Sequence, residues 1–112
     1  MKTNTKENTM KIINLTPRTI NELITNQSFP PSGIIARLDS STAQVNEINK
    51  VPLYEKLWGT IKNLPDSVEG TIYVVPGVML DAGVSQGRTD LVAPGELVRN
   101  NGKIIGCKGF SV

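Results

Sequence analysis

Short runs of β-branched and apolar residues, separated by turn-forming residues, recur along the chain. Residues 11–15 form one such run, and residues 19–24 alternate loosely between apolar and polar side chains. Both ranges predict strands, as does the apolar run 34–38. Between Gly70 and Pro76 every residue is β-branched or aromatic, which is typical of a strand buried on both faces. We expect this last run to form the central strand of a sheet.

The middle of the chain is less regular. Residues 40–50 are mostly polar, so this range is compatible either with a ragged strand or with a loop. Residues 51–59 alternate apolar and polar side chains, and Pro52 favours the edge of a sheet because proline donates no backbone hydrogen bond. Residues 77–82 predict one or two helical turns that end at Gly83.

The C-terminal part contains the clearest turn. Asn101-Gly102 separates two β-type runs, and both residues accept positive φ, so this pair predicts a tight hairpin. Together the runs predict a mainly β (α+β) fold, a compact antiparallel sheet or barrel-like domain with one short helix and a C-terminal hairpin. We expect a single domain over residues 10–112. Residues 1–9 are polar after the first methionine, so we expect them to form a flexible tail.

The amino-acid composition limits how much apolar surface one copy of this domain can bury. The chain has 112 residues, of which 38% are hydrophobic and only 4% are aromatic. Large aromatic side chains usually dominate core burial, so a monomer would be modestly stable. We therefore expect a homo-oligomer, in which a second copy supplies apolar contact area.

The counts of charged and reactive residues exclude several classes of protein. The net charge of +2 is too small to indicate a surface that binds DNA or RNA duplex. Histidine is absent, which removes Ser/His/Asp and Cys/His catalysis, and the scattered carboxylates suggest no acid/base pair. Cys107 is the only cysteine, so no zinc or iron–sulfur cluster assembles within one chain. We expect a non-catalytic protein without a metal or cofactor.

The same counts bear on localisation. A single cysteine fits a reducing, cytoplasmic compartment. No apolar run approaches the ~20 residues that span a bilayer, and residues 1–10 lack the basic and apolar segments of a secretion signal. We therefore expect neither export nor contact with a membrane.

Arginine is the most informative side chain for ligand binding, because its planar guanidinium matches phosphate or carboxylate with two hydrogen bonds. Arg37 follows a rigid Pro-Pro-Ser-Gly connector within an apolar run, and Arg99 lies beside the C-terminal turn. We interpret these two residues as candidate phosphate ligands. The alternative is that both point outward and keep a sheet soluble.

The C-terminal segment is the one local excess of positive charge. Residues 97–112 contain three basic side chains and no acidic one. Lys108 is therefore a secondary candidate for binding an anion, and Ser32 and Gly33 are candidates for polar contacts with it. An ordinary hairpin with turn glycines explains the same pattern.

Aromatic rings offer stacking surfaces for a nucleotide base, a contact worth ~1–3 kcal/mol. Phe29 and Phe110 flank the polar connectors and are the candidates for this contact. The alternative for both rings is packing in the hydrophobic core.

Several short motifs follow one another in order over about residues 10–110. They are Asn14-Leu15-Thr16-Pro17, Pro30-Pro31-Ser32-Gly33, Ala36-Arg37, Gly70-Thr71-Ile72-Tyr73, Pro94-Gly95-Glu96-Leu97-Val98-Arg99 and Gly102-Lys103-Ile104-Ile105-Gly106-Cys107. Each motif is weak singly, but the ordered set resembles a widespread family of small phage and prophage proteins. In that family a histidine commonly follows Thr-Pro, whereas this chain has Arg18.

The resemblance implies a function. The role that fits best is that of the Thoeris anti-defence sponges, symmetric oligomers that bind and sequester cyclic ADP-ribose-type signals, and in some cases cyclic oligonucleotides, without cleaving them. Such a protein needs only a few arginines, backbone donors and one stacking ring. Our candidates are Arg37 and Arg99 for phosphate, Lys108 for added charge, and Phe110 or Phe29 for stacking. The alternative function is a phage protein–protein interaction module that inhibits a host protein or serves a structural role.

Overall fold

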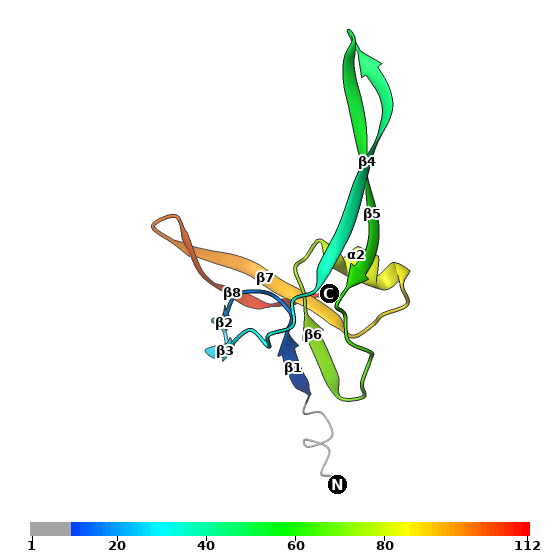
Figure 1. The fold of residues 1–112 in the computed structure, drawn as a ribbon. Coiled ribbons are helices and arrows are strands. Elements are labelled where there is room, and N and C mark those ends of the chain that lie inside the picture. Colours follow the sequence, from blue (N-terminus) through cyan, green and yellow to red (C-terminus); the bar gives the residue numbers. More distant parts are fainter. Residues whose placement is uncertain (1–9) are drawn as a thin grey trace.

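The computed structural model describes residues 10–112, so the tail predicted over residues 1–9 lies outside the described residues. The elements, in chain order, are β1 (Lys11–Asn14), β2 (Ile20–Glu22), β3 (Gln27–Phe29), β4 (Arg37–Ile48), β5 (Val51–Lys62), β6 (Thr71–Val74), α2 (Met79–Ser85), β7 (Leu91–Asn100) and β8 (Lys103–Ser111). The prediction of a mainly β fold is confirmed. Within the described residues it includes one short helix and the expected C-terminal hairpin (Figure 1).

Six of the strands form one mixed sheet in the order β1-β6-β7-β8-β2-β3. The β2–β3 and β7–β8 pairs are antiparallel, whereas β6 pairs in parallel with β1 and β7, and β8 pairs in parallel with β2. Asn14 at the end of β1 forms a bridge with Pro31 just after β3, so the sheet curls into a nearly closed barrel. The pattern predicted a mainly antiparallel sheet, whereas three of the strand pairs in this sheet are parallel. Parallel neighbours are joined by long crossovers, which leave no short turn signal in the sequence.

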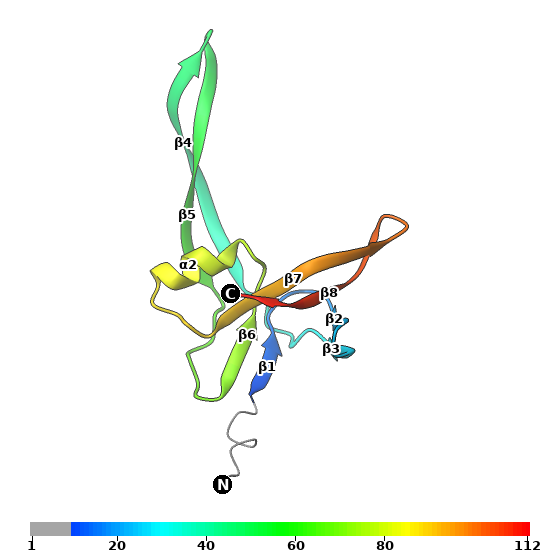
Figure 2. The same cartoon turned by 180° about the vertical axis from the view of Figure 1, so that it is seen from behind.

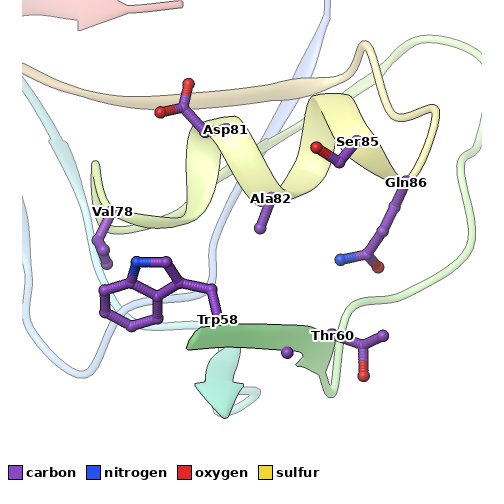
Figure 3. Close-up of a pocket in the computed structure, with 8 residues that line it drawn as sticks. Trp58, Thr60, Val78, Asp81, Ala82, Ser85 and Gln86 are labelled. Carbon is purple, nitrogen blue, oxygen red and sulfur yellow. The ribbon is translucent and has the colours of Figure 1, made fainter. Parts of the chain in front are cut away.

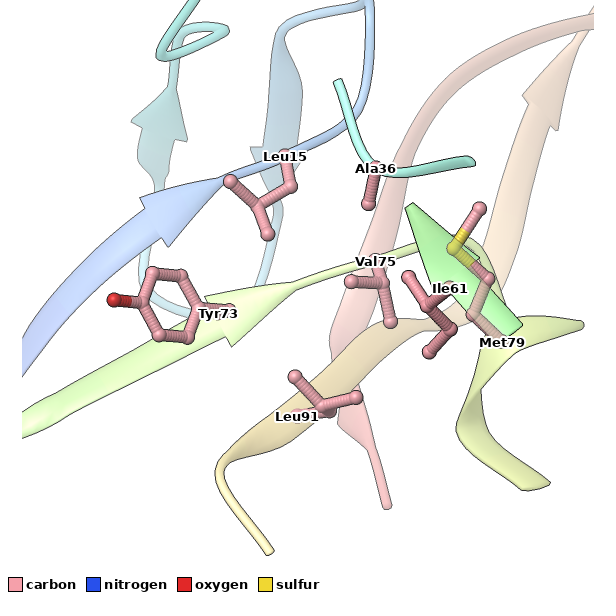
Figure 4. Close-up of a cluster of buried hydrophobic side chains, with 7 residues drawn as sticks. All are labelled: Leu15, Ala36, Ile61, Tyr73, Val75, Met79 and Leu91. Atoms are coloured by element: carbon pink, nitrogen blue, oxygen red, sulfur yellow. The ribbon is translucent and has the colours of Figure 1, made fainter. Parts of the chain in front are cut away.

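The main hydrophobic core packs around β6, which lies between β1 and β7 as the apolar run predicted. Tyr73, Val74 and Val75 are 3%, 0% and 0% exposed. Burial of a large apolar side chain is worth about 1.5–3 kcal/mol, so this strand anchors the fold. The cluster joins β6 to β5, α2 and β7 (Figure 4), and its buried members are Leu15, Ala36, Ile61, Tyr73, Val75, Met79 and Leu91.

β4 and β5 form a separate two-stranded antiparallel sheet, which projects from the barrel as a long arm (Figures 1 and 2). At its base Ile61 is buried in the core and Leu38 packs against it, but every residue from 39 to 60 is exposed. The arm extends the molecule to 67 × 38 × 25 Å. The compact outline predicted from the sequence therefore applies to the barrel and not to the arm.

The arm also changes two local predictions. The strand predicted over residues 34–38 begins only at Arg37, and the ambiguous range 40–50 is strand as far as Ile48. Asn49 and Lys50, with φ of 50° and 68°, form the two-residue turn that joins β4 to β5. Such turns favour glycine at the second position. Because this position holds a lysine, the sequence did not predict a hairpin here.

The short helix lies later in the chain than predicted. α2 runs from Met79 to Ser85, so Gly83 lies inside the helix and not at its C-terminal end. A Cβ atom at this position would collide with the side chain of Leu91, so the glycine allows α2 to lie close to β7. Gly87, with φ of 78°, follows the helix and has the role that was predicted for Gly83.

Candidate functional site

A buried asparagine holds the turn that follows β1. Asn14 is 2% exposed, and its side-chain amide donates hydrogen bonds to the carbonyl oxygens of Arg18 and Phe29, both at 2.8 Å. Its Oδ1 accepts from the backbone N–H and the hydroxyl of Thr16, at 2.8 and 2.7 Å. These four bonds satisfy the whole amide group. The turn is thereby fixed, and Arg18 lies exposed on it.

The β7–β8 hairpin faces this turn. Asn101 and Gly102, with φ of 53° and 79°, form the tight turn that the sequence predicted. Leu97, Ile104 and Ile105 are 47%, 53% and 44% exposed. The hairpin therefore presents an apolar surface to solvent, which is a common property of binding sites.

An open cavity of about 340 Å³ lies between the turn and the hairpin, and we call it the turn–hairpin cavity. Its volume falls within the range of about 300–1,000 Å³ that is typical of small-molecule sites. Apolar side chains form most of its wall, together with a few hydroxyl, amide and guanidinium groups. The lining residues include Arg18, Thr19, Asn21, Leu97, Ile104 and Cys107.

One guanidinium group lines the turn–hairpin cavity, that of Arg18. Arg99 is not a lining residue, but it lies on β7 two positions beyond the lining residue Leu97, past a register shift between Val98 and Arg99. Within residues 10–112, neither arginine has a carboxylate within 4.0 Å. Among residues 10–112, none that lines the cavity is acidic. The two guanidinium groups are therefore available to an anion.

A buried carboxylate ties the strands of the cavity wall together. Glu22 on β2 is 5% exposed and accepts hydrogen bonds from the backbone N–H groups of Ile24, Thr25 and Gly109, each at 2.8 Å. The hydroxyl of Thr25 also donates to it. These donors stabilise the charged form, so they lower the pKa of Glu22 to about 2, with the Thr25 hydroxyl contributing most. Glu22 therefore holds β2 against β8.

The residues predicted to bind phosphate lie on two different hairpins. Arg37 is exposed at the first position of β4, opposite Lys62, whereas Arg99 lies near the turn of the β7–β8 hairpin. Lys108 is exposed on β8, opposite Glu96. None of these three residues lines the turn–hairpin cavity, and of the three only Arg99 is a near neighbour in sequence of a lining residue on its own strand, Leu97.

The two predicted stacking residues contact each other. The ring centroids of Phe29 and Phe110 are 5.5 Å apart, and the rings are inclined by 55°. Both rings are half-buried and pack against a second core cluster, whose buried members are Ile20, Val74 and Cys107. Each ring therefore uses part of its surface in packing, as the core alternative expects.

Ser32 and Gly33 lie in the exposed loop between β3 and β4. The backbone N–H of Ser32 donates to the carbonyl oxygen of Asn14 at 3.0 Å, and its hydroxyl accepts from the N–H of Ile34 at 3.3 Å. Gly33 has φ of 97°, which favours glycine. Both residues shape the loop that runs alongside β1, and neither lines the turn–hairpin cavity.

Sequence reasoning did not identify Arg18 as a candidate ligand. In the sequence, Arg18 stands out only because the phage and prophage family that the chain resembles commonly has histidine at this position. The usable signal was Asn14, since a short amide side chain at the end of an apolar run commonly binds the backbone of a following turn. Such a turn leaves the residue after Thr16-Pro17 at the surface.

A larger cavity of about 580 Å³ lies between β5 and α2 (Figure 3), and we call it the arm-base groove. This groove is lined by Trp58 from β5, by Ala82 from α2 and by Val78, which lies just before α2. Its one charged lining residue is Asp81, which disfavours an anion. The turn–hairpin cavity is therefore the better site for a phosphorylated ligand.

No protein-family model matches the chain, and neither a curated protein nor a solved structure matches it significantly. In the part of the chain that the structure describes, no helix combines the length and apolarity needed to cross a membrane. In the same part, no three histidine, cysteine, aspartate or glutamate side chains are grouped as metal ligands.

Proposed function

We propose that the protein binds a small nucleotide signal of the cyclic ADP-ribose type in the turn–hairpin cavity and sequesters it without cleaving it. The main support is Arg18 at an apolar-walled cavity that no acidic residue of the described chain lines, with Arg99 two positions beyond the lining residue Leu97 on β7. Guanidinium–phosphate hydrogen bonds are both strong and specific in geometry. Such a ligand is also what the resemblance to phage anti-defence sponges implies.

The walls of the cavity suit the two chemical parts of such a ligand. The side chains of Leu97 and Ile104 offer an apolar surface to the face of a base. The hydroxyl of Thr19 and the amide of Asn21 offer hydrogen bonds to ribose hydroxyls. Cyclic oligonucleotides share these parts and are the second class of ligand that we consider.

The cavity contains no group suited to cleaving its ligand. Cys107 lines it but is only 1% exposed, and none of the described residues that line it is a histidine, lysine, aspartate or glutamate. Nucleophilic attack requires a base beside the nucleophile. Binding without turnover is what a sequestering protein needs, and in this role the protein acts in the cytoplasm of an infected or lysogenic bacterium.

Isothermal titration calorimetry with cyclic ADP-ribose isomers and cyclic trinucleotides tests the proposal. We expect at least one probe to bind. Arg18→Ala and Arg99→Ala each remove charged hydrogen bonds worth about 1.5–3 kcal/mol, so we expect affinity to fall roughly 10- to 100-fold. Arg37→Ala, which removes an exposed arginine from the other hairpin, is the matched control and should bind like the wild type.

The fate of the probe separates binding from catalysis. Chromatography after heat denaturation should return the bound probe unchanged, whereas a cleaved product contradicts the proposal. A flat titration with every probe also contradicts it. Capture of a host protein in stoichiometric amount from lysate would instead favour the protein–protein interaction module.

A further inference from the structure

The arm exposes more apolar surface than an isolated hairpin usually leaves in water. A two-stranded hairpin is at best marginally stable on its own, yet every residue from 39 to 60 is exposed. Within the described part of the chain, neither β4 nor β5 pairs with a further strand. The large apolar side chains on the arm that are at least 38% exposed are Val45, Ile48, Val51, Leu53, Tyr54, Leu57 and Trp58. Strand alternation places Val51, Leu53 and Leu57 on one face of β5 and Tyr54 and Trp58 on the other, so both faces of the arm expose apolar side chains. Exposed apolar surface of this extent marks an interface.

The base of the same arm contains a hollow that fits such side chains. In the arm-base groove, Val78 is 52% exposed and Trp58 is 49% exposed. Ala82 and Gln86 on the helix side point toward β5 across the groove (Figure 3). The groove is thus partly apolar and open. Asp81 is its acidic lining residue, and the amine of Lys56 lies 4.7 Å from the centre of the Trp58 ring.

The tip of the arm complements this groove. Ile48 and Val51 flank the turn and are 58% and 60% exposed, so two β-branched side chains lie at the far end of the arm. Lys50 in the turn itself adds a positive charge. An apolar tip with a cation therefore matches an apolar groove with a carboxylate.

We propose that a second copy of this chain covers the arm. Two arms pack antiparallel about a two-fold axis, and the tip of each arm, with Ile48, Lys50 and Val51, occupies the arm-base groove of the other copy. A two-fold contact requires both halves of the interface on one chain, and this chain has both of them, the tip of the arm and the groove between β5 and α2. The exposed run 39–60 is also similar in size to the roughly 20–30 residues that each side of a standard interface contributes.

This interface is independent of the proposed ligand. The arm-base groove and the turn–hairpin cavity have no lining residue in common. Dimerisation and nucleotide binding are therefore separate measurements, and the failure of one leaves the other to be judged by its own data.

Charge reversal in trans tests the interface on the full-length chain. By sedimentation velocity we expect the wild type to be dimeric. In a Lys50→Glu dimer, the new carboxylate at the arm tip faces the carboxylate of Asp81 in the partner's groove. In an Asp81→Lys dimer, the new amine in the groove faces the amine of Lys50. Each variant alone therefore brings two like charges together and should dimerise at least tenfold more weakly. Lys103→Glu, at the turn of the other hairpin, is the matched control and should dimerise like the wild type.

An equimolar mixture of the two weakened variants gives the decisive result. In the mixed dimer, each tip faces a groove of opposite charge, so we expect the dimer to return. Misfolded chains would not restore each other, which separates a lost contact from a lost fold. The proposal is overturned if the wild type is monomeric at all concentrations, if the single variants dimerise normally, or if mixing restores nothing.

Discussion

The backbone N–H of Gly109 donates a hydrogen bond of 2.8 Å to the carboxylate of Glu22, across 87 positions of sequence. The same carboxylate accepts from the turn that follows β2, through Ile24 and Thr25. One side chain therefore fixes a local turn and also connects β2 to β8. Its charged form is the one that these donors stabilise.

Protonation of Glu22 should destabilise the fold. Its pKa is about 2 in the folded chain and 4.5 for the free side chain. The stabilisation is therefore complete above about pH 4.5 and is lost as the pH falls toward 2. Glu22→Gln should lower the free energy of unfolding at neutral pH and flatten its dependence in the acid range. Urea denaturation at several pH values measures both effects.

The control for this experiment is Glu69→Gln, which changes an exposed carboxylate in a loop. It should keep the acid dependence of the wild type. A Glu22→Gln variant that lost stability in acid as steeply as the wild type would show that another group is responsible.

Gly106 allows β2 and β8 to approach each other. A Cβ atom there would lie 2.6 Å from the carbonyl oxygen of Asn21 and 2.8 Å from Cγ of Leu23. Gly106→Ala should therefore separate the strands and cost about 1–3 kcal/mol. Gly77→Ala has no atom within 4 Å of the new Cβ and should be nearly neutral. Thermal unfolding of the two variants gives the comparison, and equal melting temperatures would contradict the close approach.

Local signals account for the parts of the fold that the sequence predicted. Asn101-Gly102 specifies its hairpin through the φ values of two neighbouring residues, and the run ending at Val75 is apolar enough to require burial. The strand character of residues 51–59 was predicted, but the turn that joins β4 to β5 was not, because Lys50 has positive φ without being glycine or asparagine. The parallel pairing of β6 with both β1 and β7 depends on contacts between distant segments, which no local pattern encodes.

The candidate site was predicted only in part, for the same reason. Arg99 was a candidate because scarce arginines beside turns are recognisable in a sequence, and it lies two positions beyond the lining residue Leu97 on β7. Its partner Arg18 comes from a segment some eighty positions away, and it reaches the cavity because Asn14 fixes a turn. Arg37 was grouped with Arg99 by residue type alone, whereas the fold places the two on different hairpins.

The guanidinium of Arg88 forms two hydrogen bonds with Asp90, from Nε at 2.9 Å and from Nη2 at 2.8 Å. These bonds are the main reason that the pKa of Asp90 lies below its usual range. Arg88→Lys keeps the charge but loses the paired geometry, so it should cost about 1 kcal/mol. Arg37→Lys, at an exposed site, should change stability by less than about 0.5 kcal/mol. Chemical denaturation distinguishes them, and equal stabilities would mean that the second bond contributes nothing.

Trp58 should report dimerisation by itself, because it is the only tryptophan in the chain and it lines the arm-base groove. In the single chain it is 49% exposed, with the amine of Lys56 4.7 Å from the centre of its ring. Docking of a partner's arm tip should remove water from the indole, so its emission should shift to shorter wavelength as protein concentration rises. Lys50→Glu should keep the long-wavelength emission at concentrations where the wild type has shifted. A nucleotide bound in the turn–hairpin cavity should leave the emission of Trp58 unchanged, because the indole does not line that cavity.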